Sequence, residues 1–269
     1  MQPVHSSSSP VSSESTARPA GEARLTLAEH LDELRRRLGI SLLAVIVAVG
    51  IALCRVERLI QWLRRPAGHL IDRLVFFSPT EPILAYLKVA TLAGLILAMP
   101  VMLWQLWLFV RKGLTSRERA AGVWFVWWGS ALFVAGAAFA YYGLLPASLA
   151  FLLGIGRGAL EPMISLDRYL SFVTTLVFWC GVVFELPVVL LFLAQRGIVT
   201  AEWLRQQRPY AILILVIIAA IVTPTTDPVN LLLMAAPMVL LYEASILVTR
   251  WMLPRTKTAS PRSPNRRWS

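Results

Sequence analysis

The chain has 269 residues, of which 57% are hydrophobic and only 15% are charged, and its formal net charge is +11. This composition excludes an ordinary soluble domain and is typical of a membrane protein that contains several long apolar segments. Basic segments beside membrane spans account for the positive charge, so the charge does not indicate a nucleic-acid partner.

The N-terminal region divides into two parts of different composition. Residues 1–25 are rich in serine and proline and poor in large apolar residues, so we predict a disordered extension there. Thr26 then opens an amphipathic helix, because Thr26 and Glu29 form a capping box and apolar residues recur at helical spacing up to Leu38. We expect this helix to lie along the membrane interface before the chain turns into the first span.

Six apolar runs predict an all-α integral membrane domain over residues 26–250, followed by a basic disordered tail over residues 251–269. A membrane-spanning helix needs about 20 apolar residues. The fifth run is short, since its 12 apolar residues would span about 18 Å of a hydrocarbon core that is about 30 Å thick. The predicted spans are 40–53 (extendable at both ends), 82–110, 120–145, 167–194, 210–222 and 229–248.

Lysine and arginine are distributed unevenly between the two sides of these spans. Of the 26 basic residues, 18 fall in the terminal segments and in the connections after the second and fourth spans, and seven fall on the opposite side. Cytoplasmic segments carry an excess of basic residues, so we expect both termini to be cytoplasmic.

Glu185 is an ionisable residue in the middle of an apolar run over residues 170–194. A charged side chain at this depth costs roughly 3 kcal/mol on insertion scales and is normally kept where it faces a cavity or a partner. Pro187 removes a backbone donor and should kink the helix near the same level. We interpret Glu185 as an intramembrane site; the alternative is a carboxyl group that only packs against a neighbouring helix.

Seven short motifs occur in order along the chain: HLDELRRRL (30–38), MPVMLWQLWLF (99–109), GLTSRER (113–119), YLSFV (169–173), FELPV (184–188), RPY (208–210) and VTPTTDP (222–228). Together, and in their spacing to the six apolar runs, they resemble the TatC family, the polytopic subunit of the twin-arginine protein translocase.

The resemblance covers about residues 26–250 and implies six kinked transmembrane helices in a concave arrangement. It also implies a multi-pass protein of the bacterial inner membrane that binds twin-arginine signal peptides of folded precursor proteins. With the single-span partners TatA and TatB, such a protein exports these precursors using the protonmotive force. The expected surroundings are anionic lipids and further copies of this chain within a larger complex.

The same resemblance implies two sites. A signal-peptide arginine presents a planar fork of donors that a carboxylate can bind through two hydrogen bonds. The cytoplasmic site implied for the peptide comprises Glu33, Arg35, Leu38, Phe109 and Glu118, with the two glutamates as acceptors. The site implied for TatA or TatB comprises Glu185, Thr223 and Asp227. Without the resemblance, Glu118 would be interpreted as a loop carboxylate that balances its two neighbouring arginines.

A proton-coupled secondary transporter with Glu185 as its intramembrane site is the competing interpretation. It predicts two related halves with broken helices, and residues 26–140 show no repeat in residues 141–250. The sequence also lacks HExxH and GxSxG motifs, and its three histidines are scattered. We therefore predict no enzymatic activity, no metal site and no cofactor.

Overall fold

The computed structural model describes residues 20–68, 74–111, 122–155, 163–223 and 227–252. These residues are almost entirely helical, apart from strands β1 (Leu74–Val75) and β2 (Ile164–Ser165), which pair in parallel. The helices are α1 (Ala20–Leu53), α2 (Val56–Arg64), the short η1 (Arg65–Ala67), α3 (Glu81–Val110), α5 (Gly122–Phe139), a π-helical segment (Ala140–Leu144), α6 (Leu145–Gly154), α7 (Leu166–Phe184), α8 (Leu186–Gln195), α9 (Ala201–Gln206), α10 (Arg208–Val222) and α11 (Pro228–Met252).

The predicted all-helical membrane fold is confirmed. Within the described residues, five helical segments are long and apolar enough to cross a membrane, and α10 is a shorter apolar helix. The five segments are Leu31–Leu53, Glu81–Val110, Gly122–Gly154, Leu166–Gln195 and Pro228–Trp251. The third extends nine residues beyond its predicted end at residue 145, because α6 continues the direction of the chain after the π segment.

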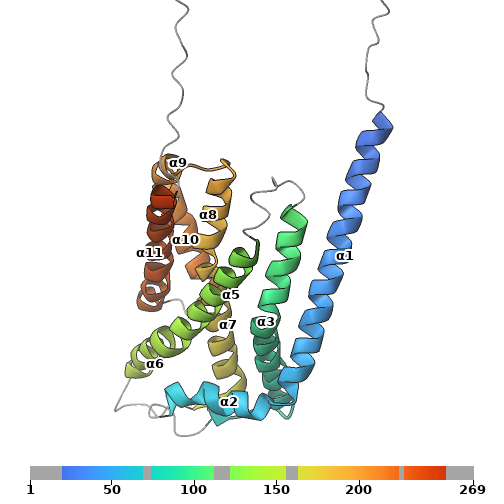
Figure 1. Cartoon of the computed structure of the whole chain (residues 1–269). Coiled ribbons are helices and arrows are strands. Elements are labelled where there is room, and N and C mark those ends of the chain that lie inside the picture. The colour runs from blue at the N-terminus through green and yellow to red at the C-terminus, as the bar shows by residue number, and fades with distance from the viewer. Residues whose placement is uncertain (1–19, 69–73, 112–121, 156–162, 224–226, 253–269) are drawn as a thin grey trace, which may run out of the picture.

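The N-terminal amphipathic segment differs from its prediction. α1 is continuous from Ala20 to Leu53, so the segment does not turn before the first span (Figure 1). Residues 20–53 contain no proline, and helix propagation adds a backbone hydrogen bond for each further residue, so nothing in this sequence ends the helix. The prediction of a separate interfacial helix was therefore wrong.

The helices form a bundle with two distinct ends (Figure 1). α1 lies at one edge and packs against α3, while α8 to α11 lie at the opposite edge. α2 lies across one end, which we call the α2 end. α1 begins and α11 finishes at the other end, which we call the termini end. The described ends of the α3–α5 connection also lie at the termini end.

Glycines spaced by seven residues let α5 approach its neighbours closely. A Cβ atom on Gly129 would lie 2.7 Å from Cδ1 of Leu103 in α3, and one on Gly136 would lie 2.7 Å from the carbonyl oxygen of Cys180 in α7. Seven residues are close to two helical turns, so these glycines share one face of the helix. This face of α5 therefore packs closely against both α3 and α7.

The fourth span is interrupted where Pro187 predicted a kink. α7 ends at Phe184 and α8 begins at Leu186, so Glu185 lies at the break. Pro187 has no backbone N–H and cannot donate the helical hydrogen bond that would join the two segments.

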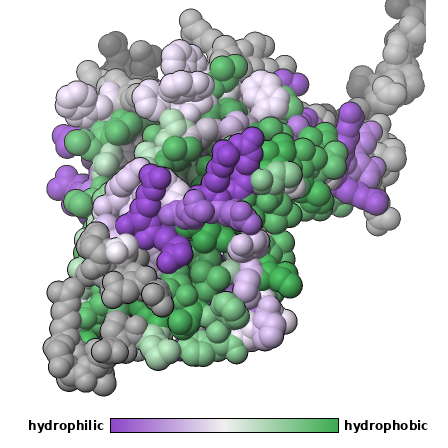
Figure 2. Space-filling view, turned by 90° about the horizontal axis from the view of Figure 1, so that it is seen from below, coloured by the Kyte–Doolittle hydropathy of each residue, from purple (hydrophilic) through white to green (hydrophobic). Residues whose placement is uncertain are grey.

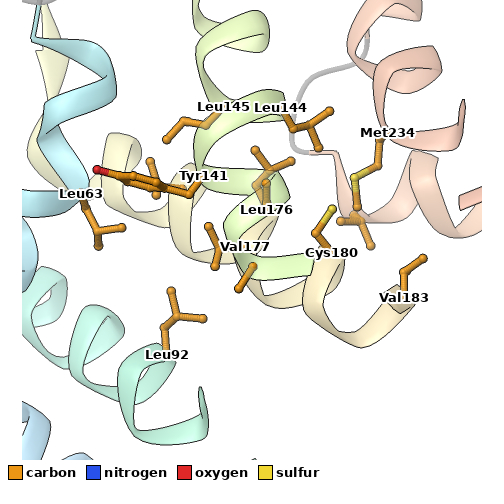
Figure 3. Close-up of a cluster of buried hydrophobic side chains, with 14 of the residues drawn as sticks. Leu63, Leu92, Tyr141, Leu144, Leu145, Leu176, Val177, Cys180, Val183 and Met234 are labelled. Carbon is orange, nitrogen blue, oxygen red and sulfur yellow. The ribbon is translucent and has the colours of Figure 1, made fainter. Parts of the chain in front are cut away.

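The apolar core lies between α2, α3, α7, α11 and the π segment (Figure 3). Figure 3 shows Tyr141 of the π segment beside Leu63 of α2, with Leu176, Val177 and Cys180 of α7 close by. Between the end of α5 with the π segment and the first half of α11 lies an apolar hollow of about 610 Å³. Its lining includes Phe139, Leu144 and one face of α11 from Val229 to Leu240.

Hydrogen bonds from two tyrosines hold α2 across its end of the bundle. Tyr141 donates to the carbonyl of Trp62 at 2.5 Å, and Tyr169 donates to the carbonyl of Leu63 at 2.8 Å. The rings of Trp62 and Tyr141 also stack, with centroids 3.9 Å apart. Viewed from this end, hydrophilic side chains gather across the middle of the face, with hydrophobic ones around them (Figure 2).

Candidate functional site

Glu33 lies on the side of α1 that packs against α3, near the termini end. Its Oε1 accepts from Nε of Arg37, one turn later on the same helix, at 2.8 Å, and also from a terminal nitrogen of that guanidinium. Nη1 of Arg37 reaches Oε1 of Gln105 in α3 at 3.5 Å. The side chains of Arg37 and Glu33 are only 16% and 11% exposed, so the structure holds a guanidinium on this carboxylate in a largely buried position.

The other residues predicted for the signal-peptide site do not all share the face of Glu33. Arg35 and Leu38 lie on the exposed side of α1, and Leu38 is 66% exposed. Phe109 is half-buried in the last turn of α3. Glu118 lies outside the described residues. The structure therefore places Glu33 and Phe109 on adjacent helices and turns Arg35 and Leu38 outward.

Glu185 is buried at the break between α7 and α8, with 8% of its surface exposed. Its carboxylate lies against Gly129 of α5, where an added Cβ would be 3.0 Å from Oε2 and 3.5 Å from Oε1. Among the described residues, Oε1 has no hydrogen-bond partner, and neither does the buried hydroxyl of Ser130 beside Gly129. Glu185 therefore lies between packed helices, with its carboxyl group against a residue that has no side chain.

Thr223 and Asp227 have roles within this chain at the ends of two helices. The Thr223 hydroxyl donates to the Ala219 carbonyl at 2.8 Å in the last turn of α10. Asp227 precedes α11 and accepts from the backbone N–H of Asn230 at 2.7 Å and from its side-chain amide at 2.9 Å. Asp227 therefore caps α11, which satisfies backbone donors that a helix start leaves unpaired.

Two ion pairs between helices were not predicted from the sequence. Nζ of Lys88 in α3 donates to Asp167 of α7 at 2.5 Å and to the Ser171 hydroxyl at 2.7 Å. Arg208 of α10 pairs with Glu243 of α11 at 2.5 Å. A lone lysine and a lone glutamate within apolar runs were the available signals, because charges at such positions need partners.

Sequence reasoning also missed the partner of Glu33. Glutamate followed four residues later by arginine is the spacing of a pair on one helix face, and Glu33 and Arg37 have that spacing.

Within the residues that the structure describes, no group of histidine, cysteine, aspartate or glutamate side chains is arranged to hold a metal ion.

Comparisons with known proteins agree on one family. The family model described as Sec-independent protein translocase protein (TatC) matches residues 29–237. The chain is 39% identical over 256 residues to the Sec-independent protein translocase protein TatC of Koribacter versatilis, covering 90% of this chain and 94% of the relative. It is 40% identical over 228 residues to the protein of that name from Aquifex aeolicus, covering 83% and 94%.

A solved structure shows the same similarity in three dimensions. The crystal structure of the twin-arginine translocase receptor TatC in DDM superposes with a TM-score of 0.76 at 40% sequence identity. The match covers 82% of this chain and 99% of the crystallised one.

Proposed function

The chain belongs to the TatC family of Sec-independent protein translocase proteins, and we propose that it is the signal-peptide receptor of a twin-arginine translocase. At the coarser level it is a multi-pass membrane protein and a non-enzymatic subunit of a protein translocase. The family assignment does not favour the proton-coupled transporter considered above.

The Glu33–Arg37 pair is the observation that carries the receptor proposal. Glu33 binds a guanidinium in a largely buried position in the first half of α1, the half that begins at the termini end of the bundle. The peptide would present the same chemical group, and a charge-assisted hydrogen bond is stronger where water is largely excluded. Glu118 would supply the second acceptor, from the segment that connects α3 with α5.

We place the termini end in the cytoplasm of a bacterial cell, with α10 as the sixth crossing of the inner membrane. The excess of basic residues in the terminal segments and in the connections at that end supports this orientation. α10 has 15 residues and would extend about 22 Å, so the bilayer beside it would have to thin or neighbouring helices would have to cover its ends.

Glu185, Thr223 and Asp227 are proposed to contact the helices of TatA or TatB within the membrane. The unpartnered Oε1 of Glu185 supports this for the first residue, because a buried polar atom in a membrane gains from a hydrogen bond with a partner. A bond of this kind contributes about 1 kcal/mol, which suits a transient assembly. Anionic lipids and further copies of the chain complete the proposed complex, and the protonmotive force would drive transport.

Titration with a twin-arginine peptide tests the receptor. Glu33→Ala and Glu118→Ala should each weaken binding by about tenfold to a hundredfold, because each removes a charged acceptor worth roughly 1.5–3 kcal/mol. Glu57→Ala at the α2 end is the matched control and should leave affinity unchanged. A twin-lysine peptide should bind poorly, and added salt should weaken all specific binding. Unchanged affinity in both site variants would remove the assignment.

Crosslinking to TatA and TatB tests the intramembrane site. Glu185→Gln should retain most crosslinking, since an amide still donates and accepts hydrogen bonds, whereas Glu185→Leu should lose it. Peptide affinity, measured on the same preparations, should stay near that of the parent in both variants. If Glu185→Leu crosslinks and transports normally, the carboxyl group is only structural.

A further inference from the structure

The contacts of Glu33 also bear on how strongly the receptor would bind its ligand. Arg37 directs two N–H groups at the same oxygen of Glu33 and reaches Gln105 of the neighbouring helix with a third. The guanidinium is therefore held from both α1 and α3, next to the carboxylate that the proposed function assigns to a peptide arginine. An incoming arginine would meet a carboxylate that already has a guanidinium partner.

We propose that Arg37 is an internal competitor of the signal peptide, and that binding exchanges its guanidinium on Glu33 for one from the peptide. This inference rests on the proposed function of Glu33. The exchange conserves the charge balance at the carboxylate, because one guanidinium leaves as another arrives. The peptide's interaction with Glu33 must then be stronger than the ion pair that Arg37 gives up, and the cost of breaking that pair lowers the affinity of the peptide.

Competition of this kind lowers the affinity of every ligand that binds Glu33, by a factor set by the internal ion pair. A peptide guanidinium presents the same planar fork as Arg37, whereas a lysine ammonium is a more strongly hydrated point charge without that fork. The preference for arginine would therefore come from Glu33 itself, and Arg37 would set how strongly any peptide binds there.

Arg37→Gln separates this effect from general charge repulsion when it is compared with Arg36→Gln. Arg36 is exposed on the same turn, so both variants remove one positive charge from the same region. Affinities for a twin-arginine and a twin-lysine peptide would be measured on the full-length detergent-solubilised chain, at two ionic strengths. Arg37→Gln should raise affinity for the twin-arginine peptide by about twofold to fivefold more than Arg36→Gln does, the range expected for one released ion pair. It should raise affinity for the twin-lysine peptide by a similar factor, because both peptides are released from the same internal competitor.

Two results would overturn the proposal. One is a gain in Arg37→Gln no larger than in Arg36→Gln, which would leave only long-range repulsion. The other is weaker binding in Arg37→Gln, which would show that Arg37 positions Glu33. Arg37→Lys, which keeps the charge but not the fork, should fall between the parent and Arg37→Gln, and it serves if the glutamine variant does not fold. Glu33→Gln in the parent chain tells a failure of the proposed function from a failure of this inference. If Glu33→Gln leaves peptide binding intact, the proposed function fails. If it weakens binding while the Arg37 variants behave like Arg36→Gln, only the competition by Arg37 is refuted.

Discussion

Replacing Gly136 with alanine should loosen the contact between α5 and α7. The new Cβ would lie 2.7 Å from the Cys180 carbonyl oxygen and from the Phe184 side chain, whereas ordinary contacts begin at 3.4 Å. The carbonyl oxygen belongs to the backbone of α7, so the helices must separate by about 0.7 Å, the difference between these two distances. Overpacking of this kind costs about 1–3 kcal/mol. Alanine recovers about 0.5–1 kcal/mol through its higher helix propensity, so mid-range values leave a net loss of roughly 1 kcal/mol.

Thermal unfolding of the detergent-solubilised chain, followed by circular dichroism, measures this loss. A net destabilisation of that size corresponds to a decrease in Tm of roughly 2–4 °C for a chain of about this length. Gly50→Ala is the control, because a Cβ on this exposed glycine of α1 meets nothing within 4 Å. Its Tm should be unchanged or slightly higher. Equal Tm values for the two variants would refute the close packing of α5 against α7.

Two further predictions concern the interior and the orientation. Lys88→Met should lower Tm by more than the double variant Lys88→Met/Asp167→Asn does, because the single change leaves a partly buried carboxylate without its cation. A double variant that is no more stable than Lys88→Met would contradict the pairing. Single cysteines at Ser8 and Ser260 should react with a membrane-impermeant maleimide only from the cytoplasm, whereas one at Ser78 should react only from outside, and the reverse pattern would break the proposed orientation.

Hydropathy predicted the spans well because a bilayer imposes length and apolarity on every crossing helix. The break at Glu185 could also be predicted, since proline lacks the donor that a continuous helix needs. The continuity of α1 could not be read from the polar face of residues 30–38. A charged residue that looks suited to water or lipid headgroups can instead contact a neighbouring helix, as Arg37 does with Gln105 of α3.

The sequence indicated which residues could form the candidate sites, but not which neighbours they contact in the fold. The burial of Glu185 depends on Gly129, a residue 56 positions earlier in the chain whose contribution is the absence of a side chain. The spacing of Glu33 and Arg37 permits an ion pair. The further contact of Arg37 with Gln105 depends on how α1 and α3 pack, which the spacing does not show. The positions of Arg35 and Leu38 on the outward face follow from that same packing.

The π segment between α5 and α6 puts the two halves of the third span out of phase. A π turn closes its hydrogen bond one residue later than an α turn, and each residue of a helix turns the chain by about 100°. Gly143 continues the seven-residue spacing from Gly136, yet a Cβ there would approach only Phe139 of its own span, at 3.7 Å. One helix thereby contacts two sets of neighbours: the glycines of α5 face α3 and α7, and Tyr141 within the π segment faces α2. A single-residue deletion within the π segment would bring the halves into register and rotate one of these faces away from its partner.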